Sequence, residues 1–174
     1  MKYLMIRLIA VFLFFSCQNE KGVKNWSDTS SLTTFIAKRN KANTLDFFRA
    51  LEAENAEQVA ALFSNDAKHI NPYHSGIFPK GANSKEGIKS YWEPVFPNFD
   101  GMTFHIKEIY SMGDGNRVFV KYKGYINLKD NAGVYSNDYY STFKFNDEGK
   151  ITEYVEIFNP IVAAKGFGLL DKVK

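Results

Sequence analysis

The sequence has 174 residues and a nearly balanced charge, with 22 basic and 19 acidic side chains giving a net charge of +3. This balance gives no case for nucleic-acid binding, because such proteins concentrate a large excess of basic side chains. A single cysteine excludes an intrachain disulfide, so the fold must be stabilised by an apolar core. Aromatic residues make up 16% of the chain, which suits a pocket lining as well as a core.

The first 17 residues have the layout of an export signal. Lys2 and Arg7 supply a basic start, and the apolar run at 8–15 is too short to span a bilayer comfortably. A small residue and then Cys17 follow, which resembles the bacterial lipobox, where the cysteine is lipidated and becomes the new N-terminus. A plain signal peptide with an incidental cysteine is the alternative, but a lone free thiol is disfavoured in an exported protein. We therefore predict a lipoprotein signal peptide over 1–17 and lipidation of Cys17.

Cleavage before Cys17 changes the charge and sets the expected location. Loss of Lys2 and Arg7 leaves 20 basic side chains against 19 acidic ones, a net charge of +1. No case for a polybasic membrane patch remains. Gln18 follows the cysteine, whereas an aspartate there retains lipoproteins in the inner membrane of some bacteria. We therefore predict a lipid-anchored protein of the cell envelope, with the outer membrane favoured.

Residues 18–42 are predicted to hold a flexible tether and the start of the first helix. Lys, Asn, Ser and Thr dominate 18–31, which is typical of a flexible segment. The stretch 32–36 can already begin the first helix, and Asn43 or Thr44 is an expected N-cap before apolar residues at helical spacing. A second helix at 56–63, a strand at 67–71, a loop at 72–81 and a third helix at 84–97 are expected to follow.

Beyond residue 100 the hydrophobic pattern changes to the alternation that is typical of strands. Four strands are expected at 102–110, 117–127, 138–146 and 151–158. Turn sequences rich in Gly, Asp and Asn separate them and predict an antiparallel meander. A short helix or a packed tail is expected at 161–170. No internal repeat or second domain is evident.

Helices followed by strands predict an α+β fold, with three N-terminal helices packed on a curved antiparallel sheet. A twisted sheet wraps around what it packs against, so the helices are expected on its concave face. Three short helices rarely fill such a cone to its mouth. We therefore expect a pocket inside the cone.

The C-terminal strands carry a family resemblance. The segment 136–151 ends a strand in an acidic, glycine-containing turn, and the next strand ends in Glu156-Ile157-Phe158-Asn159-Pro160. These motifs, with the element order of 43–168, resemble the NTF2-like, or SnoaL-like, cone fold, here assigned to a domain at 43–174. The Glu-x-x-Asn-Pro ending and the tail around Gly168 are similar to the PhzA/PhzB branch, although the turn has one extra residue, Glu148. The superfamily hosts isomerases, cyclases, hydratases and binding-only members, so the fold does not name a reaction.

Glu156 is the leading candidate for a catalytic residue. It shares one strand face with Tyr154 and Phe158. The resemblance implies that this glutamate points into the cavity and acts as an acid or base, a role that a carboxylate among aromatic side chains suits. A hydrogen-bonded or salt-bridged position at the pocket rim, without chemistry, is the alternative.

His69 is the candidate partner of Glu156. It alternates with Asn71 onto one face of the first strand, and an imidazole can exchange a proton near neutral pH. The PhzA/PhzB resemblance implies a histidine on the third helix, but 84–96 contains none, so the condensation chemistry of that branch is not expected. A satisfied strand residue is the alternative for His69.

The remaining candidates are ligand-binding residues. We expect Tyr73 and His74 at the mouth of the cone, Trp92 on the third helix, and Tyr122 facing inward from a strand. The two neighbouring histidines lack a clear third ligand, so neither a metal nor a cofactor is predicted.

Three functions remain open on the sequence. The first is a lipid-anchored module that binds a small, largely apolar molecule in the cone pocket. The second is an acid/base isomerase or cyclase-like enzyme that uses Glu156 with His69. The third is a non-catalytic interaction lipoprotein, with a sheet face available for a homodimer.

Overall fold

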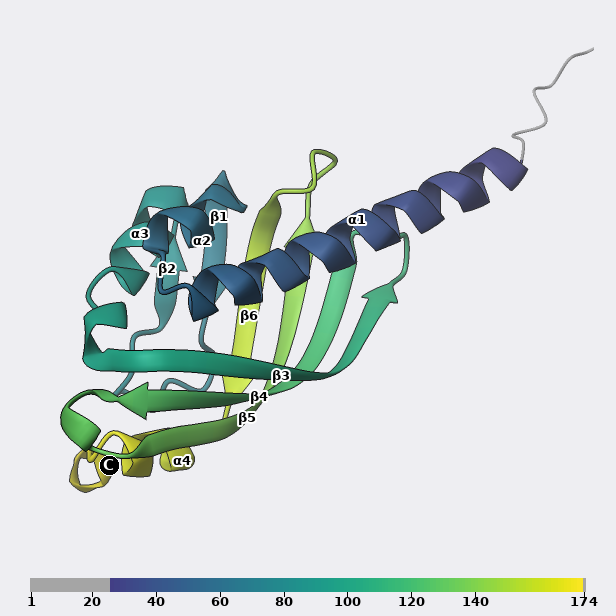
Figure 1. Cartoon of the computed structure of the whole chain (residues 1–174). Coiled ribbons are helices and arrows are strands. Elements are labelled where there is room, and N and C mark those ends of the chain that lie inside the picture. The colour runs from purple at the N-terminus through teal and green to yellow at the C-terminus, as the bar shows by residue number, and fades with distance from the viewer. Residues whose placement is uncertain (1–25, 174) are drawn as a thin grey trace, which may run out of the picture.

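The computed structural model describes residues 26–173, which form an α+β fold as predicted. The helices are α1 (Trp26–Glu52), α2 (Ala56–Ala61), α3 (Lys85–Trp92) and α4 (Pro160–Gly166), and the strands are β1 (Phe63–Ile70), β2 (Gly81–Asn83), β3 (Phe99–Met112), β4 (Arg117–Leu128), β5 (Val134–Phe145) and β6 (Ile151–Phe158). One curved sheet has the strand order β2-β1-β6-β5-β4-β3, with α1, α2 and α3 on its concave side (Figure 1). None of the helices in these residues combines the length and apolar character needed to span a bilayer.

The sheet is mixed, whereas the sequence suggested a wholly antiparallel one. Strands β3 to β6 form the expected antiparallel meander, but β1 pairs in parallel with β6. The sequence pattern also missed β2, a three-residue strand antiparallel to β1. Gly81 permits that pairing, because a Cβ atom there would lie 2.0 Å from the carbonyl oxygen of His69. Its φ of +118° also favours glycine.

Helix α1 begins at Trp26, so the predicted tether over 18–31 is wrong for 26–31. The remaining tether and the predicted signal with Cys17 lie outside the described residues. The predicted N-cap at Asn43 is also wrong, because its side chain lies within the helix and donates to the carbonyl of Gly149 at 2.8 Å. Asn40 likewise donates to the carbonyl of Gly115 at 2.9 Å. These contacts with two hairpin turns stabilise the part of α1 that precedes the N-cap position predicted from the local sequence.

The other helices begin at side-chain caps. Asn55 accepts a hydrogen bond from the backbone of Gln58 at the start of α2, and Ser84 accepts one from Gly87 at the start of α3. Helix α2 is shorter than predicted because Phe63 already belongs to β1. Helix α3 ends at Trp92, before the predicted 97.

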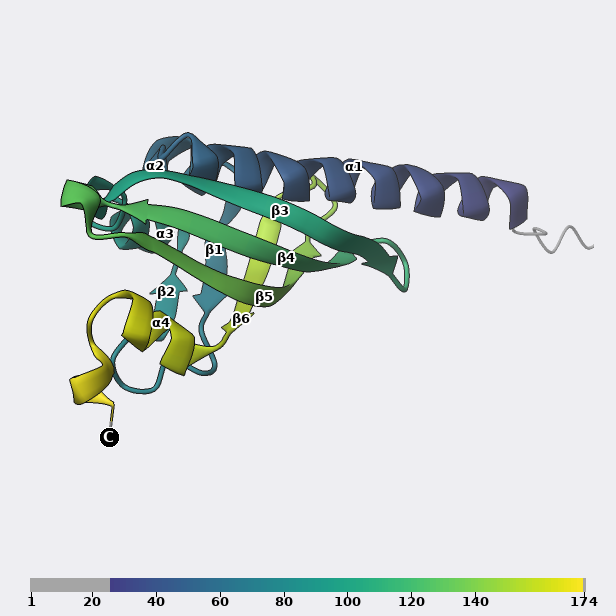
Figure 2. The same cartoon turned by 60° about the horizontal axis from the view of Figure 1, so that its bottom comes forward.

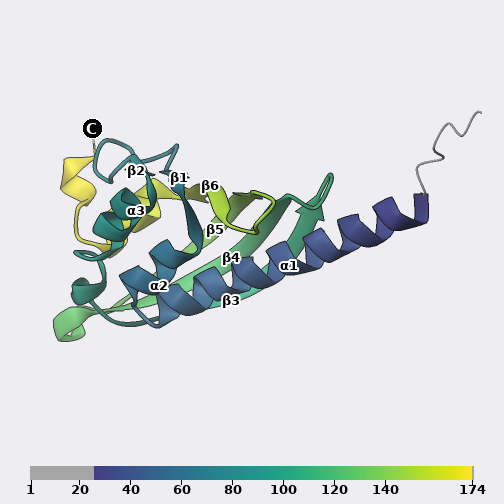
Figure 3. The same ribbon diagram turned by 90° about the horizontal axis from the view of Figure 1, so that it is seen from above.

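Aromatic side chains fill the part of the cone next to α1. Phe47 packs against Phe143 and Tyr154 with ring centroids 5.2 and 4.8 Å away, and Phe48 packs against Tyr122 at 4.6 Å. All five are almost completely buried. Seen from above in Figure 3, α1 runs along the β3 side of the sheet, so its last two turns fill only part of the concave face.

The opposite end of the cone is covered by α4, as Figure 2 shows. Asn159 caps this helix by accepting hydrogen bonds from the backbone of Ile161 and Val162, and Pro160 occupies the first turn. The Asn-Pro pair after β6 therefore starts a helix. Of the short helix and the packed tail expected at 161–170, the structure shows the helix, with its bounds at Pro160–Gly166.

Candidate functional site

A cavity of about 360 Å³ lies between the concave sheet face, α3 and α4. Its walls are mostly apolar and aromatic, and among the described residues Glu156 is the one charged residue that lines it. The other lining side chains with a polar group are those of Tyr91, Trp92, Asn98, Tyr135 and Tyr139. This volume suits a small organic ligand. The pocket expected from the sequence is therefore present.

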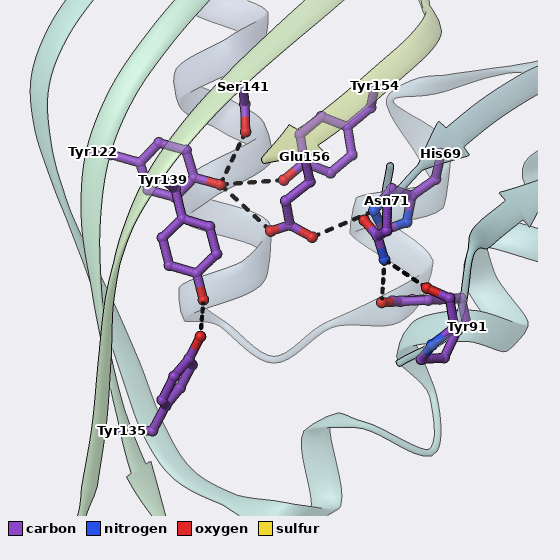
Figure 4. Close-up of polar contacts among 10 residues, drawn as sticks. His69, Asn71, Tyr91, Tyr122, Tyr135, Tyr139, Ser141, Tyr154 and Glu156 are labelled. Atoms are coloured by element: carbon purple, nitrogen blue, oxygen red, sulfur yellow. Dashed lines mark hydrogen bonds and ion pairs between the residues drawn. The ribbon is translucent and has the colours of Figure 1, made fainter. Parts of the chain in front are cut away.

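Glu156 and His69 lie together, as the sequence hypothesis required. The carboxylate Oε2 is 3.5 Å from His69 Nε2, and the two side chains are 12% and 0% exposed. Figure 4 shows Glu156 between His69 on one side and Tyr122 on the other. His69 does not line the cavity itself, because the rings of Tyr91 and Tyr154 pack against it at 4.7 and 4.8 Å. Only Glu156 of this pair can touch a ligand there.

Tyr122 connects the carboxylate to two further hydroxyl groups. Its hydroxyl lies 3.2 Å from Ser141 Oγ, 3.2 Å from the Tyr154 hydroxyl and 3.5 Å from Glu156 Oε1 (Figure 4). One assignment uses each proton once, with Ser141 and Tyr154 donating to Tyr122, and Tyr122 donating to Glu156. The inward direction predicted for Tyr122 is confirmed, since it is 1% exposed. It lies behind the carboxylate and does not line the cavity.

Asn71 orients the hydroxyl of Tyr91. Its side-chain amide donates to the carbonyl of Pro79 and to the Tyr91 hydroxyl, both at 3.1 Å. These two bonds use both amide protons, so Tyr91 accepts here and its own proton stays available. Since Tyr91 lines the cavity, that proton can be donated to a ligand or toward Glu156. Trp92, a predicted ligand-binding residue, also lines the cavity.

Burial raises the pKa values of the tyrosines around the carboxylate. The pKa of Tyr91 is raised mainly by burial and then by the negative charge of Glu156. Burial also raises the pKa values of Tyr122 and Tyr154 well above 10.0, again with Glu156 as the second cause. These hydroxyls therefore stay protonated at neutral pH and act as hydrogen-bond donors.

Tyr135 and Tyr139 form a polar site on the wall of the cavity that the sequence analysis did not identify. Their hydroxyls are 3.0 Å apart, and Asn137 donates to the Tyr135 hydroxyl at 2.9 Å. Tyr139 is 6% exposed and faces inward, whereas its neighbour Tyr140 is 43% exposed and faces outward. The expected strand began at residue 138 and so omitted Tyr135. Residues 135, 137, 139 and 141 are all buried, but in the sequence Asn137 and Ser141 interrupt the apolar alternation that would have signalled this face.

The structure places Tyr73 and His74 away from this cavity. Tyr73 is 58% exposed and lies in a surface groove with Tyr140 and Ile157. His74 accepts a hydrogen bond from the backbone of Gly76 within its own loop. Both residues follow β1 in a loop, and neither lines the cavity, so the expectation that the two lie at the mouth of the cone is wrong.

The site presents one carboxylate to the cavity, a group that can accept or donate a proton. No group of three His, Cys, Asp or Glu side chains among residues 26–173 could hold a metal ion. Neither ring nitrogen of His69 completes a hydrogen bond in this part of the chain, and its closest polar approach is to Glu156. A curved sheet, three helices on its concave face and one acidic residue in an aromatic cavity define a cone-fold protein of the SnoaL-like class.

The family comparison agrees with that description. The SnoaL-like domain profile matches residues 44–154, and the chain belongs to this family. No curated protein sequence gives a significant match.

Solved structures show the same fold at low sequence identity. A candidate isomerase from Bacillus subtilis is 20% identical with a TM-score of 0.69, covering 76% of this chain and 94% of its own. A phenazine biosynthesis-related protein from Pseudomonas aeruginosa is 16% identical with a TM-score of 0.67, covering 78% and 85%. An LEH-like epoxide hydrolase from M. tuberculosis is 16% identical with a TM-score of 0.61, covering 74% and 84%. The shared fold thus hosts several activities and does not select one.

Proposed function

We propose that this protein binds a small, largely apolar molecule in its cone cavity, with Glu156 contacting the polar part of that molecule. The observation that carries this proposal is the single carboxylate in a cavity of about 360 Å³ with otherwise apolar and aromatic walls. Such a combination of apolar walls and few polar groups is typical of small-molecule sites. The hydroxyls of Tyr91 and Tyr139 supply further donors for orientation.

Recovery of a ligand from the purified protein tests the binding function. Native mass spectrometry should detect a mass above that of the lipidated or processed chain, and solvent extraction should release a small apolar compound. Leu169→Trp should lower its occupancy at least about tenfold, because a larger side chain there fills the cavity wall.

Leu170→Trp is the matched control for that experiment. Leu170 is the next residue, is 49% exposed and does not line the cavity. This variant should retain the ligand. Equal occupancy in both variants, or no ligand in any preparation from the native host, would contradict the binding proposal.

Acid/base catalysis is the second candidate function, favoured by the 3.5 Å approach of His69 to Glu156. In this proposal the Glu156 carboxylate accepts a proton from one carbon of the ligand and returns it to another carbon. The ligand is therefore isomerised, and neither the ligand nor the protein gains or loses a proton overall. His69 does not reach the cavity and acts as a positioning residue for the carboxylate. The hydroxyl of Tyr91 can donate to the oxygen on which negative charge develops.

Hydrogen exchange of the recovered compound tests this second function. Incubation with the protein in deuterated water should incorporate deuterium at the carbon facing Glu156, read by mass spectrometry. Glu156→Gln should abolish incorporation, while Glu153→Gln, on the outer face of the same strand, should leave its rate unchanged. His69→Gln should slow the rate and shift its pH profile. Incorporation that survives Glu156→Gln would remove the carboxylate from the mechanism.

We also propose that Cys17 anchors this domain to a membrane by its lipid. The basic start, apolar run and cysteine at the end of the N-terminal segment support this proposal. Palmitate fed to the host should label the wild-type protein, and Cys17→Ala should abolish the label. Label retained in that variant would contradict lipidation at this residue.

A further inference from the structure

We infer that the ligand of the cavity is an organic cation, an apolar amine or quaternary ammonium compound whose positive charge lies against Glu156. This inference rests on the proposed binding function and adds the chemical class of the ligand. It follows from the charge, the hydrogen bonds and the aromatic lining of the cavity.

The charge of Glu156 has no permanent counterion in the described part of the chain. No lysine or arginine lines the cavity, and none forms an ion pair with this carboxylate in residues 26–173. His69 is the one ionic neighbour of Glu156 within 26–173 and is charged only if protonated. A largely buried carboxylate is costly unless a positive charge or several hydrogen bonds compensate it. A cationic ligand supplies that compensation from the cavity side.

The hydrogen bonds of Glu156 are also incomplete. Its two oxygens make contacts of 3.5 Å with the Tyr122 hydroxyl and with His69 Nε2, both at the long limit for such interactions. An ionised carboxylate offers about four acceptor positions, so about two remain without a partner. A quaternary ammonium group compensates these oxygens by its charge alone, and a protonated amine can also donate N–H groups to them. An anionic ligand would be repelled by the same carboxylate.

Aromatic rings supply the other half of a cation site. Nine of the eighteen residues that line the cavity are aromatic. Tyr139 flanks the carboxylate in Figure 4, and Tyr91 lies on its other side next to His69. The faces of such rings attract ammonium groups, most strongly where water is excluded. A carboxylate combined with an aromatic enclosure therefore favours an alkylated ammonium group over a neutral apolar molecule of the same shape.

A pair of isosteric probes tests this inference. Benzyltrimethylammonium and neopentylbenzene have the same shape and differ by one positive charge. Ligand-observed NMR titration of the full chain should give a Kd for the cation at least about tenfold lower than for the neutral compound. Binding of the neutral compound with equal or higher affinity overturns the inference, and this comparison needs only the wild-type protein.

Two charge-neutralising variants test whether Glu156 causes the preference for the cationic probe. Glu156→Gln keeps the shape of the side chain and should remove the preference for the cation, whereas Glu153→Gln on the same strand should retain it. A preference that persists in Glu156→Gln overturns the assignment. Binding of the neutral probe alone overturns the cation inference but leaves the proposed binding function intact. Binding of neither probe contradicts the cation inference, while the proposed function is decided separately by ligand recovery and Leu169→Trp.

Discussion

Acidic side chains on the two faces of the sheet differ in whether a basic side chain pairs with them. On the outer face, Glu108 pairs with Lys121 at 3.0 Å and Asp138 pairs with Lys107 at 2.9 Å. On the inner face, Glu156 has no lysine or arginine partner among residues 26–173, and its contacts are both 3.5 Å long. Exposed ion pairs contribute little to stability, whereas a buried carboxylate without a cation costs stability. Fold stability therefore does not account for the inner carboxylate, in agreement with the proposed contact between Glu156 and a ligand.

The aromatic residues show the same contrast between the faces. Phe143 points inward and is fully buried, while Tyr140 on the same strand points outward and is 43% exposed. Inner aromatics form the core beside α1 and the walls of the cavity. Outer aromatics have water on one side. Mutations on the two faces should consequently differ most in their effect on stability.

The largest expected effect is that of Phe143→Ala. This ring packs against Phe47 at 5.2 Å and Tyr154 at 4.7 Å, so its removal leaves a cavity that the sheet and α1 cannot close. We expect the free energy of unfolding to fall by about 3–5 kcal/mol, against less than about 1 kcal/mol for Tyr140→Ala. Urea unfolding of both variants measures the difference. Similar losses would show that the outer face is also packed in solution.

The sequence predicted the inner face because its pattern is local. Alternation along β4 predicted that Tyr122 points inward, and alternation along β6 placed Glu156 beside Tyr154. Those two predictions depend only on the period of a strand. The four-strand meander followed from the turns between its strands. The residues that share a strand face with Glu156 could therefore be predicted from the alternation, whereas its inward direction was implied by the family resemblance.

The pairing of His69 with Glu156 depends on contacts that a local pattern does not contain. Strand β1 pairs in parallel with β6, which sets His69 opposite Tyr154, two residues before the glutamate. Parallel partners are far apart in sequence, so their register could not be predicted from turns. The early start of α1 was missed for a related reason, since Asn40 and Asn43 are held by distant hairpin turns.

Alkaline pH is expected to have an intermediate effect on the free energy of unfolding, because the buried tyrosines ionise only in the unfolded chain. Burial raises the pKa values of Tyr122, Tyr139 and Tyr154 well above 10.0 in the folded state. Above pH 10 the unfolded chain loses these protons while the folded chain keeps them, so the free energy of unfolding falls as pH rises. The loss is at most about 1.4 kcal/mol per pH unit for each tyrosine. Below that pH the three residues add no pH dependence.

Tyr122→Phe sharpens this prediction. Urea unfolding between about pH 9 and about pH 11 should show a slope lower by close to one proton than that of the wild type. The outer-face variant Tyr140→Phe serves as the control for the loss of a tyrosine as such. Equal slopes in wild type and Tyr122→Phe would mean that the buried hydroxyl ionises in the folded protein.

The smallest expected effect on stability is that of neutralising one carboxylate on each face. Glu156→Gln removes a buried charge that no lysine or arginine compensates, so the free energy of unfolding should rise by about 1 kcal/mol at neutral pH. Glu108→Gln removes an exposed ion pair and should leave stability unchanged within measurement. A protein that becomes more stable when its inner carboxylate is neutralised, and loses its ligand at the same time, has retained that charge for binding. A loss of stability in Glu156→Gln would instead show that His69 and Tyr122 compensate the charge within the fold.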